Sequence, residues 1–270
     1  NLFLRNMPRL SVDIDLAYLP IEDRDTSLTG IDNALEEIIE DIEKRIPRAQ
    51  VKALVLKGAG KRYKLLVQQG STNVKVEVTP VLRGSVYPVE KRRISENAEQ
   101  AFGFASATLL SFEDLFAGKI CATLDRQHPR DLYDTYWLLQ NEGINERLKD
   151  AFLVYLMSHN RPMSELLAPK SQDISPLYRT EFEGMTFEAI DVERLQDTLP
   201  QLVNKIHGAL SDDDRRFLLD LKQGNQDWKK FQLPEVEMLP AIQWKLLNLA
   251  RMNPDKRRQA ADKLEKILYR

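Results

Sequence analysis

The sequence predicts an α+β protein, in which strands and one helix are followed by a mostly helical second half. Apolar and polar residues alternate over residues 11–16 and 73–79, as they do in half-buried strands. From residue 111 onward, apolar residues instead recur at three- and four-residue steps, the period of a helix that packs on one face. Strands followed by a run of helices are typical of an α+β fold.

The first predicted strand, residues 11–16, carries two acidic residues on one face. Side chains two positions apart in a strand point the same way, so Asp13 and Asp15 project together. The opposite face is aliphatic and consists of Val12, Ile14 and Leu16. Neighbouring carboxylates repel each other, and Mg²⁺, which takes one or two carboxylates plus substrate phosphates, relieves this repulsion. The pair therefore indicates metal-assisted transfer at a nucleotide phosphate, while a solvated polar face is the alternative.

A helix and two further strands follow. After an expected polar loop over residues 20–30, isoleucine and leucine at helical spacing predict a helix over residues 31–46, which Pro47 ends. The two strands and the turn between them are predicted at residues 63–69, 73–79 and 70–71.

Glu77 lies on the polar face of the second of these strands, together with Lys75. If this strand neighbours the first strand in one sheet, Glu77 converges with Asp13 and Asp15 as a third carboxylate. An exposed strand face with alternating lysine and glutamate would explain the same residues without a metal site.

Charged residues crowd a predicted helix–turn–helix corner near residue 128. Ser111, with an acid three residues later, resembles a capping box and predicts the start of the first of these helices. The corner collects charges of both signs, namely Lys119, Arg126, Arg130, Asp131 and Asp134. Acids in the first turn of a helix complement its dipole, which accounts for Asp131 and Asp134 but not for the cations beside them.

The remaining sequence predicts helices around an irregular stretch over residues 162–187. The expected helices cover residues 146–157, 192–210, 214–221, 241–252 and 255–268. No internal repeat or low-complexity tract interrupts them.

Composition excludes several classes of protein. The 270 residues carry a formal net charge of −2, and the one cysteine, Cys121, rules out an internal disulfide or a multi-cysteine zinc site. No apolar run approaches the roughly 20 residues of a membrane-spanning helix, so we expect a cytoplasmic protein without a membrane partner. The near-neutral charge argues against bulk electrostatic binding of nucleic acid. Two local basic patches remain, Lys91-Arg92-Arg93 and Lys256-Arg257-Arg258.

Two ordered blocks of the sequence resemble one protein family. Residues Arg9 to Leu16 resemble the R-x-S-x-D-x-D-L core of AbiEii-type nucleotidyltransferases, the toxins of type IV toxin–antitoxin and abortive-infection systems, which include the MenT enzymes. Leu115 to Lys119 and Arg130 to Asp134 are similar to the family's helix with A-x-K followed by R-D-x-Y-D. A Lys-x-Glu strand lies between the blocks, and the resemblance covers about residues 1–140.

The resemblance implies a DNA-polymerase-β-like nucleotidyltransferase core with a small mixed sheet flanked by helices, followed by a mainly helical C-terminal domain. We place the core in residues 1–110 and the helical domain, which carries the second block, in residues 111–270. The family has a Gly-Gly/Ser-Thr turn before its first helix, where the nucleotide phosphates bind. The sequence begins past that turn, so we expect it to start inside a domain, and loss of the turn from the molecule would weaken triphosphate binding.

The resemblance assigns the first block to metal and nucleotide binding. Asp13 and Asp15 match the family's metal-binding pair, and Glu77 stands where the superfamily often has a third carboxylate. Arg9 and Ser11 match positions beside the metal pair, so we expect them to contact the nucleotide.

The second block is expected to complete the catalytic centre. Lys119 and Asp131 match its catalytic residues, and Lys119 is also expected to bind the nucleotide. A fixed cation such as Lys119 would stabilise the charge on the non-bridging phosphate oxygens in the transition state. Asp131 would orient Lys119, or contact the acceptor or the base, and these roles stay open.

The function that the resemblance implies is Mg²⁺-dependent transfer of a nucleoside monophosphate from a nucleoside triphosphate to an acceptor hydroxyl. The 3′ end of transfer RNA is the expected acceptor, and a cognate antitoxin is an expected partner. Two alternatives remain: a catalytically decayed interaction protein of the same fold, which the start of the sequence favours, and a small-molecule nucleotidyltransferase.

Overall fold

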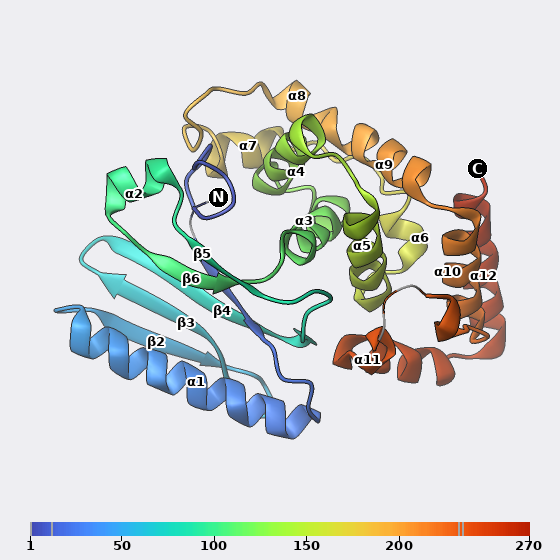
Figure 1. The fold of residues 1–270 in the computed structure, drawn as a ribbon, viewed down its shortest axis with the longest axis horizontal. Coiled ribbons are helices and arrows are strands. Elements are labelled where there is room, and N and C mark those ends of the chain that lie inside the picture. Colours follow the sequence, from blue (N-terminus) through green and yellow to red (C-terminus); the bar gives the residue numbers. More distant parts are fainter. Residues whose placement is uncertain (1, 12, 232, 234) are drawn as a thin grey trace. The chain divides into compact units, whose positions relative to one another are not determined.

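The computed structural model describes residues 2–11, 13–231, 233 and 235–270 (Figure 1). Val12, which we expect on the apolar face of the first strand, lies outside the described residues. The chain forms two compact units. The sheet unit comprises Ser11–Ser85 and Met238–Ala241, and the helical unit comprises Asn1–Leu10, Val86–Glu237 and Ile242–Arg270.

The sheet unit is a four-stranded mixed sheet with one long helix. The strands lie in the order β1 (Asp13–Tyr18), β4 (Thr72–Arg83), β3 (Arg62–Gln69) and β2 (Gln50–Val55). β1 runs parallel to β4, whereas β3 is antiparallel to both of its neighbours. Helix α1 (Arg24–Arg45) lies along one face of this sheet (Figure 1). The buried core between them consists of Ile31, Leu35, Leu65, Val76 and Val78. These elements confirm the small mixed sheet that the sequence predicts.

Helix α1 begins earlier than the apolar pattern indicates, so the expected polar loop over residues 20–30 is wrong. Asp23 caps the helix, since its carboxylate accepts hydrogen bonds from the backbone N–H groups of Asp25 and Thr26, both at 3.0 Å. The first turns then bury Ser27 and Leu28 among otherwise exposed polar residues. A cap followed by a polar turn has no apolar periodicity, which is why the prediction began at residue 31.

The helical unit opens with a two-stranded antiparallel sheet. Its strands β5 (Glu90–Arg93) and β6 (Ser106–Leu109) are connected through helix α2 (Glu96–Phe102). The larger helices that follow are α3 (Phe112–Arg126), α4 (Pro129–Asn141), α5 (Glu146–Ser158), α9 (Thr198–Ala209), α10 (Asp212–Gln223), α11 (Pro240–Ala250) and α12 (Pro254–Leu268). The short helices are α6 (Met163–Leu166), α7 (Ser175–Glu181) and α8 (Val192–Gln196). Within the described residues, no helix combines the length and the apolar character needed to cross a membrane.

Asp114 joins the segment before β5 to the helices. It is buried, and its carboxylate accepts hydrogen bonds from the backbone N–H groups of Val86 at 2.8 Å and Tyr87 at 3.0 Å. The hydroxyls of Ser111 and Tyr155 also donate to it, at 2.7 Å and 3.2 Å. Ser111 caps α3 as the sequence predicts, by accepting from the Asp114 N–H. These bonds hold the segment before β5 to α3 and α5. The compact units divide at residue 85, and the domain boundary expected at residue 110 stays a prediction.

Candidate active site

The register of β1 against β4 brings the predicted carboxylates onto one face of the sheet. Asp13 lies beside Lys75, and Asp15 lies beside Glu77. The alternate residues on these strands, such as Leu16 and Val76, pack toward α1. The condition set by the sequence, that the two strands be neighbours, is therefore met. Asp13, Asp15, Glu77, Lys64 and Lys75 together form what we call the carboxylate face.

Lysines offset the negative charge of the carboxylate face. Lys75 Nζ lies 3.0 Å from Asp13 Oδ2 and 3.8 Å from Glu77 Oε2, and Lys64 Nζ lies 3.0 Å from Glu77 Oε2. The hydrogen bond to Glu77 raises the pKa of Lys64. The side chains in these pairs keep between 23% and 34% of their surface exposed. Because they are partly solvated and sit on flexible stems, the lysines can exchange partners.

The chemistry of the carboxylate face fits Mg²⁺. Two carboxylates on one side of a strand, Asp13 and Asp15, supply hard oxygen ligands and leave other coordination positions for phosphate and water. Among the described residues, no group of three His, Cys, Asp or Glu side chains is arranged to hold a metal ion jointly. Glu77, which binds Lys64, thus stays a predicted third ligand.

In the helical unit, the corner between α3 and α4 surrounds the buried carboxylate of Asp134. Gln127, in the left-handed backbone conformation, ends α3, and His128 caps α4. Arg9 binds Asp134 with two parallel hydrogen bonds, Nε to Oδ1 at 2.8 Å and Nη2 to Oδ2 at 2.7 Å. Lys119 Nζ reaches the same Oδ2 at 2.5 Å. We call these three residues the Asp134 cluster.

The electrostatics of the Asp134 cluster hold the Asp134 carboxylate in its charged form. Burial of Asp134 favours the neutral acid, but Lys119 and Arg9 outweigh it and lower the pKa of Asp134 well below its usual range. Two cations thus face one carboxylate. The Lys119 side chain remains 30% exposed, compared with 9% for Arg9 and 3% for Asp134. Lys119 is therefore a cation fixed at one side and open to solvent at the other.

Asp131 does not orient Lys119, which corrects one of its expected roles. Its carboxylate binds Arg126 instead, with Nε to Oδ2 at 2.6 Å and Nη2 to Oδ1 at 3.1 Å. The carboxylate beside Lys119 is that of Asp134, three residues further along α4. Both acids belong to the Arg-Asp-x-Tyr-Asp block, and helical spacing alone does not tell which one faces α3. Contact of Asp131 with the acceptor or the base stays a prediction.

Arg9 and Ser11, both expected beside the nucleotide, lie in contrasting surroundings. Arg9 is buried, and besides Asp134 its guanidinium reaches the backbone oxygen of Leu10 at 2.7 Å. A bridge between Arg9 and Thr186 ties its backbone to the segment after α7. Ser11 is exposed and is the first residue of the sheet unit. Their contact with a nucleotide stays a prediction.

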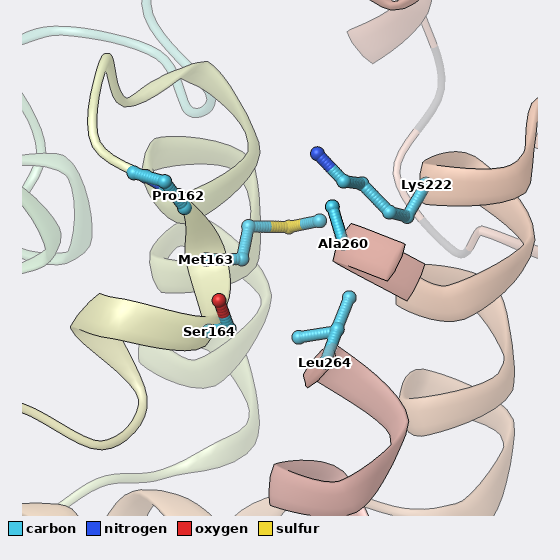
Figure 2. A pocket seen from close by; sticks show the side chains of 6 residues that line it. All are labelled: Pro162, Met163, Ser164, Lys222, Ala260 and Leu264. Atoms are coloured by element: carbon cyan, nitrogen blue, oxygen red, sulfur yellow. The ribbon is translucent and has the colours of Figure 1, made fainter. Parts of the chain in front are cut away.

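Two other features of the helical unit, a small pocket and Cys121, do not suit nucleotide binding or catalysis. A small pocket, with about 10 Å³ of free space, is lined by Pro162, Met163, Ser164, Lys222, Ala260 and Leu264 (Figure 2). That space holds about one water molecule, so it is too small for a nucleotide. Cys121 is buried, and burial raises the pKa of its thiol, so it is the small buried residue that its sequence position predicts.

Comparisons with known proteins identify the family. No curated protein matches this chain. Among solved structures, the chain is similar to MenT4, a nucleotidyltransferase toxin from Mycobacterium tuberculosis, with a TM-score of 0.53 and 16% sequence identity over 98% of this chain and 80% of that one. This similarity shows a shared fold. The family model described as "Nucleotidyl transferase AbiEii toxin, Type IV TA system" matches residues 1–248. The chain therefore belongs to the AbiEii family of nucleotidyltransferase toxins of type IV toxin–antitoxin systems.

Proposed function

We propose that this nucleotidyltransferase toxin transfers a nucleoside monophosphate from a nucleoside triphosphate to a hydroxyl group of RNA, in a reaction that requires Mg²⁺. The 3′ end of transfer RNA is the acceptor we favour, and a cognate antitoxin is the partner that silences the activity. The observation that carries the proposal is the register of β1 and β4, which aligns Asp13, Asp15 and Glu77 on one solvated face.

In this proposal, Asp13 and Asp15 hold the metal and Glu77 lies beside it. Bound there, Mg²⁺ would neutralise charge on the triphosphate and on the leaving pyrophosphate. Lys75 and Lys64 currently pair with carboxylates, at 3.0 Å each. When the carboxylates turn to a metal, these amines are free to pair with phosphate oxygens, so the face can bind a polyanion despite its three acids.

The Asp134 cluster supplies the remaining cation. Lys119 is held by Asp134 on one side and stays partly exposed on the other, as a group that stabilises developing negative charge must be. Arg9 and Asp134 act as positioning residues that fix the Lys119 amine.

Asp131 and Ser11 are the remaining residues to which we assign a role. Asp131 is 7% exposed, and its partner Arg126 keeps 64% of its side chain exposed, so the pair presents a basic group to solvent near the start of α4. We propose that this pair contacts the acceptor or the base. Exposed Ser11, two residues before Asp13, would donate its hydroxyl to a phosphate oxygen.

Incubation of the protein with each labelled nucleoside triphosphate, Mg²⁺ and bulk transfer RNA tests the proposal. We expect label on the RNA that disappears when EDTA removes the metal, with the circular dichroism spectrum unchanged. Label on a small molecule and not on RNA would support the antibiotic-modifying kind of nucleotidyltransferase instead. Absence of transfer to any acceptor, in a protein that still binds its antitoxin, would support the catalytically decayed alternative.

A further inference from the structure

The two-stranded sheet of the helical unit has a basic face that the proposed chemistry does not use. β5 pairs with β6 so that Lys91 lies beside Thr108 and Arg93 lies beside Ser106. Side chains two apart in a strand share a face, and all four of these residues are exposed. One face of this sheet therefore presents two cations and two hydroxyls to solvent.

Two exposed phenylalanines precede β6, and one of them contacts this face. Phe102, the last residue of α2, is 69% exposed, and Phe104 is 63% exposed. Only Gly103 separates them, and its φ of +87° is a backbone conformation that favours glycine. The guanidinium of Arg93 lies over the ring of Phe104, 5.0 Å from its centroid. Single exposed apolar side chains are common, but two exposed rings one residue apart in the chain, one of them beneath the guanidinium of Arg93, form a specific combination.

The acids near this surface leave its cations accessible. Glu90 binds Arg92, at 2.7 Å, on the opposite face of β5. Glu99 approaches Arg93 at 3.7 Å, in a loose pair in which the arginine side chain is 72% exposed. Such an exposed pair is weak and readily replaced by a phosphate.

We propose that this surface, formed by Lys91, Arg93, Phe102, Phe104, Ser106 and Thr108, binds a single-stranded segment of the acceptor RNA. The proposal rests on RNA being the acceptor. Bases stack on exposed aromatic rings whatever their sequence, while lysine and arginine pair with the backbone phosphates. The hydroxyls of Ser106 and Thr108 bond to phosphate oxygens or ribose 2′-hydroxyls. This local surface also explains how a chain with a formal net charge of −2 attracts RNA.

Fluorescence anisotropy of a labelled single-stranded RNA, measured on the full chain without nucleotide, tests the surface directly. Phe102→Ala/Phe104→Ala should weaken binding about tenfold or more, as the loss of stacking platforms does in other single-strand binders. Lys91→Ala/Arg93→Ala should reduce the slope of log Kd against log salt by about 1.4, or about 0.7 for each lost phosphate contact. Arg93→Lys should keep that slope but weaken binding, because lysine does not stack on Phe104 as arginine does.

The chain offers matched controls for both kinds of substitution. Tyr269 is an aromatic residue of similar exposure, 52%, and Lys256 and Arg258 are exposed cations of the other basic patch, on α12. Tyr269→Ala and Lys256→Ala/Arg258→Ala should leave RNA affinity and salt dependence unchanged. All variants should retain the melting temperature of the parent, because the substituted side chains are exposed.

The proposal is overturned if the surface variants bind single-stranded RNA like the parent or like the controls. It is also overturned if they lose binding of an antitoxin but not of RNA, because the surface would then be a protein-docking site. Binding is measured without triphosphate, so its outcome is separate from that of the transfer reaction. RNA binding that depends on this surface in a protein without transferase activity would refute the proposed function alone. Transfer to RNA by a protein indifferent to these substitutions would refute the surface alone.

Discussion

Asp13 in the sheet unit and Asp134 in the helical unit both bind a lysine, but their surroundings differ. Asp13 and its partner Lys75 keep 27% and 34% of their side-chain surface exposed. Asp134 keeps 3% and is bound by both Lys119 and Arg9. A partly exposed ion pair contributes about 0–1 kcal/mol, because solvent and side-chain entropy oppose it. A buried carboxylate and its cations, in contrast, depend on each other, because either sign alone would be a desolvated charge.

The difference separates two uses of a carboxylate. On the carboxylate face, weak pairs let Asp13 exchange Lys75 for a metal. Asp13 should therefore contribute to the rate of nucleotide transfer more than to the free energy of unfolding. In the Asp134 cluster, strong pairs fix Lys119 in one position. Asp134 should therefore contribute mainly to the free energy of unfolding. The comparison therefore predicts that substitution of Asp13 lowers activity more than stability, and that substitution of Asp134 lowers stability first.

The largest expected effect on stability is that of Asp134→Asn. The amide removes the negative charge that Asp134 places beside buried Arg9 and Lys119, so the free energy of unfolding should fall by about 3–5 kcal/mol, measured by urea denaturation. Because the folded pKa of Asp134 lies below the unfolded value, its stabilisation is present above about pH 4 and is lost as pH falls further. The difference in free energy of unfolding between the parent and the variant should therefore shrink as the pH falls below about 4.

The matched control for this prediction is Asp131→Asn on the same helix. Arg126, the partner of Asp131, keeps 64% of its side chain exposed, so this variant should lose less than about 1 kcal/mol. Equal losses for the two variants would remove the distinction between the Asp134 cluster and the pair of Asp131 with exposed Arg126.

Asp13→Asn should instead lower activity strongly and stability little. Loss of a metal-binding carboxylate should lower the rate of nucleotide transfer by about 10²–10³-fold or more. The free energy of unfolding should change by less than about 1 kcal/mol, because the pair of Asp13 with Lys75 is partly exposed. Labelled nucleotide incorporation and urea denaturation measure the two quantities, and transfer at the parental rate would contradict the assignment of the metal site.

Lys245 extends the comparison to a lysine whose charged form is disfavoured by burial. Its amine donates to the backbone oxygen of His159 at 2.6 Å, and burial, followed by repulsion from Lys222, lowers its pKa to about 8. Between about pH 8 and pH 10.5 the unfolded chain binds more protons at this residue, so the free energy of unfolding should rise with pH by at most about 3 kcal/mol, and by less because solvent screens the partly buried amine. Lys245→Met should be more stable than the parent at pH 7 and should lack this rise in urea denaturation; a parallel pH profile for both proteins would argue against it.

The smallest expected effect is that of Lys75→Met. The free energy of unfolding should change by less than about 1 kcal/mol. Mg²⁺ should bind a few-fold more tightly in calorimetry, because the amine that competes for Asp13 is gone. Lys52→Met, on β2 at the edge of the sheet opposite β1, is the control. Weaker metal binding in Lys75→Met than in this control would mean that Lys75 supports the site instead of competing for it.

Local patterns predicted most of the elements and one face of the candidate site. Alternation placed Asp13, Asp15 and Glu77 on polar strand faces, because the period of a strand fixes which way each side chain points. The same reasoning did not show that α1 begins at Arg24, because its start depends on the Asp23 cap and not on apolar spacing.

Residue identity by itself determined the α+β class, the acidic strand, the charged corner and, through ordered motifs, the family. Tertiary structure decided which groups pair: β1 beside β4, Lys75 on Asp13, and Lys119 on Asp134 and not on Asp131. Periodicity is a property of one segment and can be read along the chain. Pairing depends on how two distant segments pack, and the bonds to Arg9 and Lys119 that make Asp134 different from Asp131 exist only after they have packed.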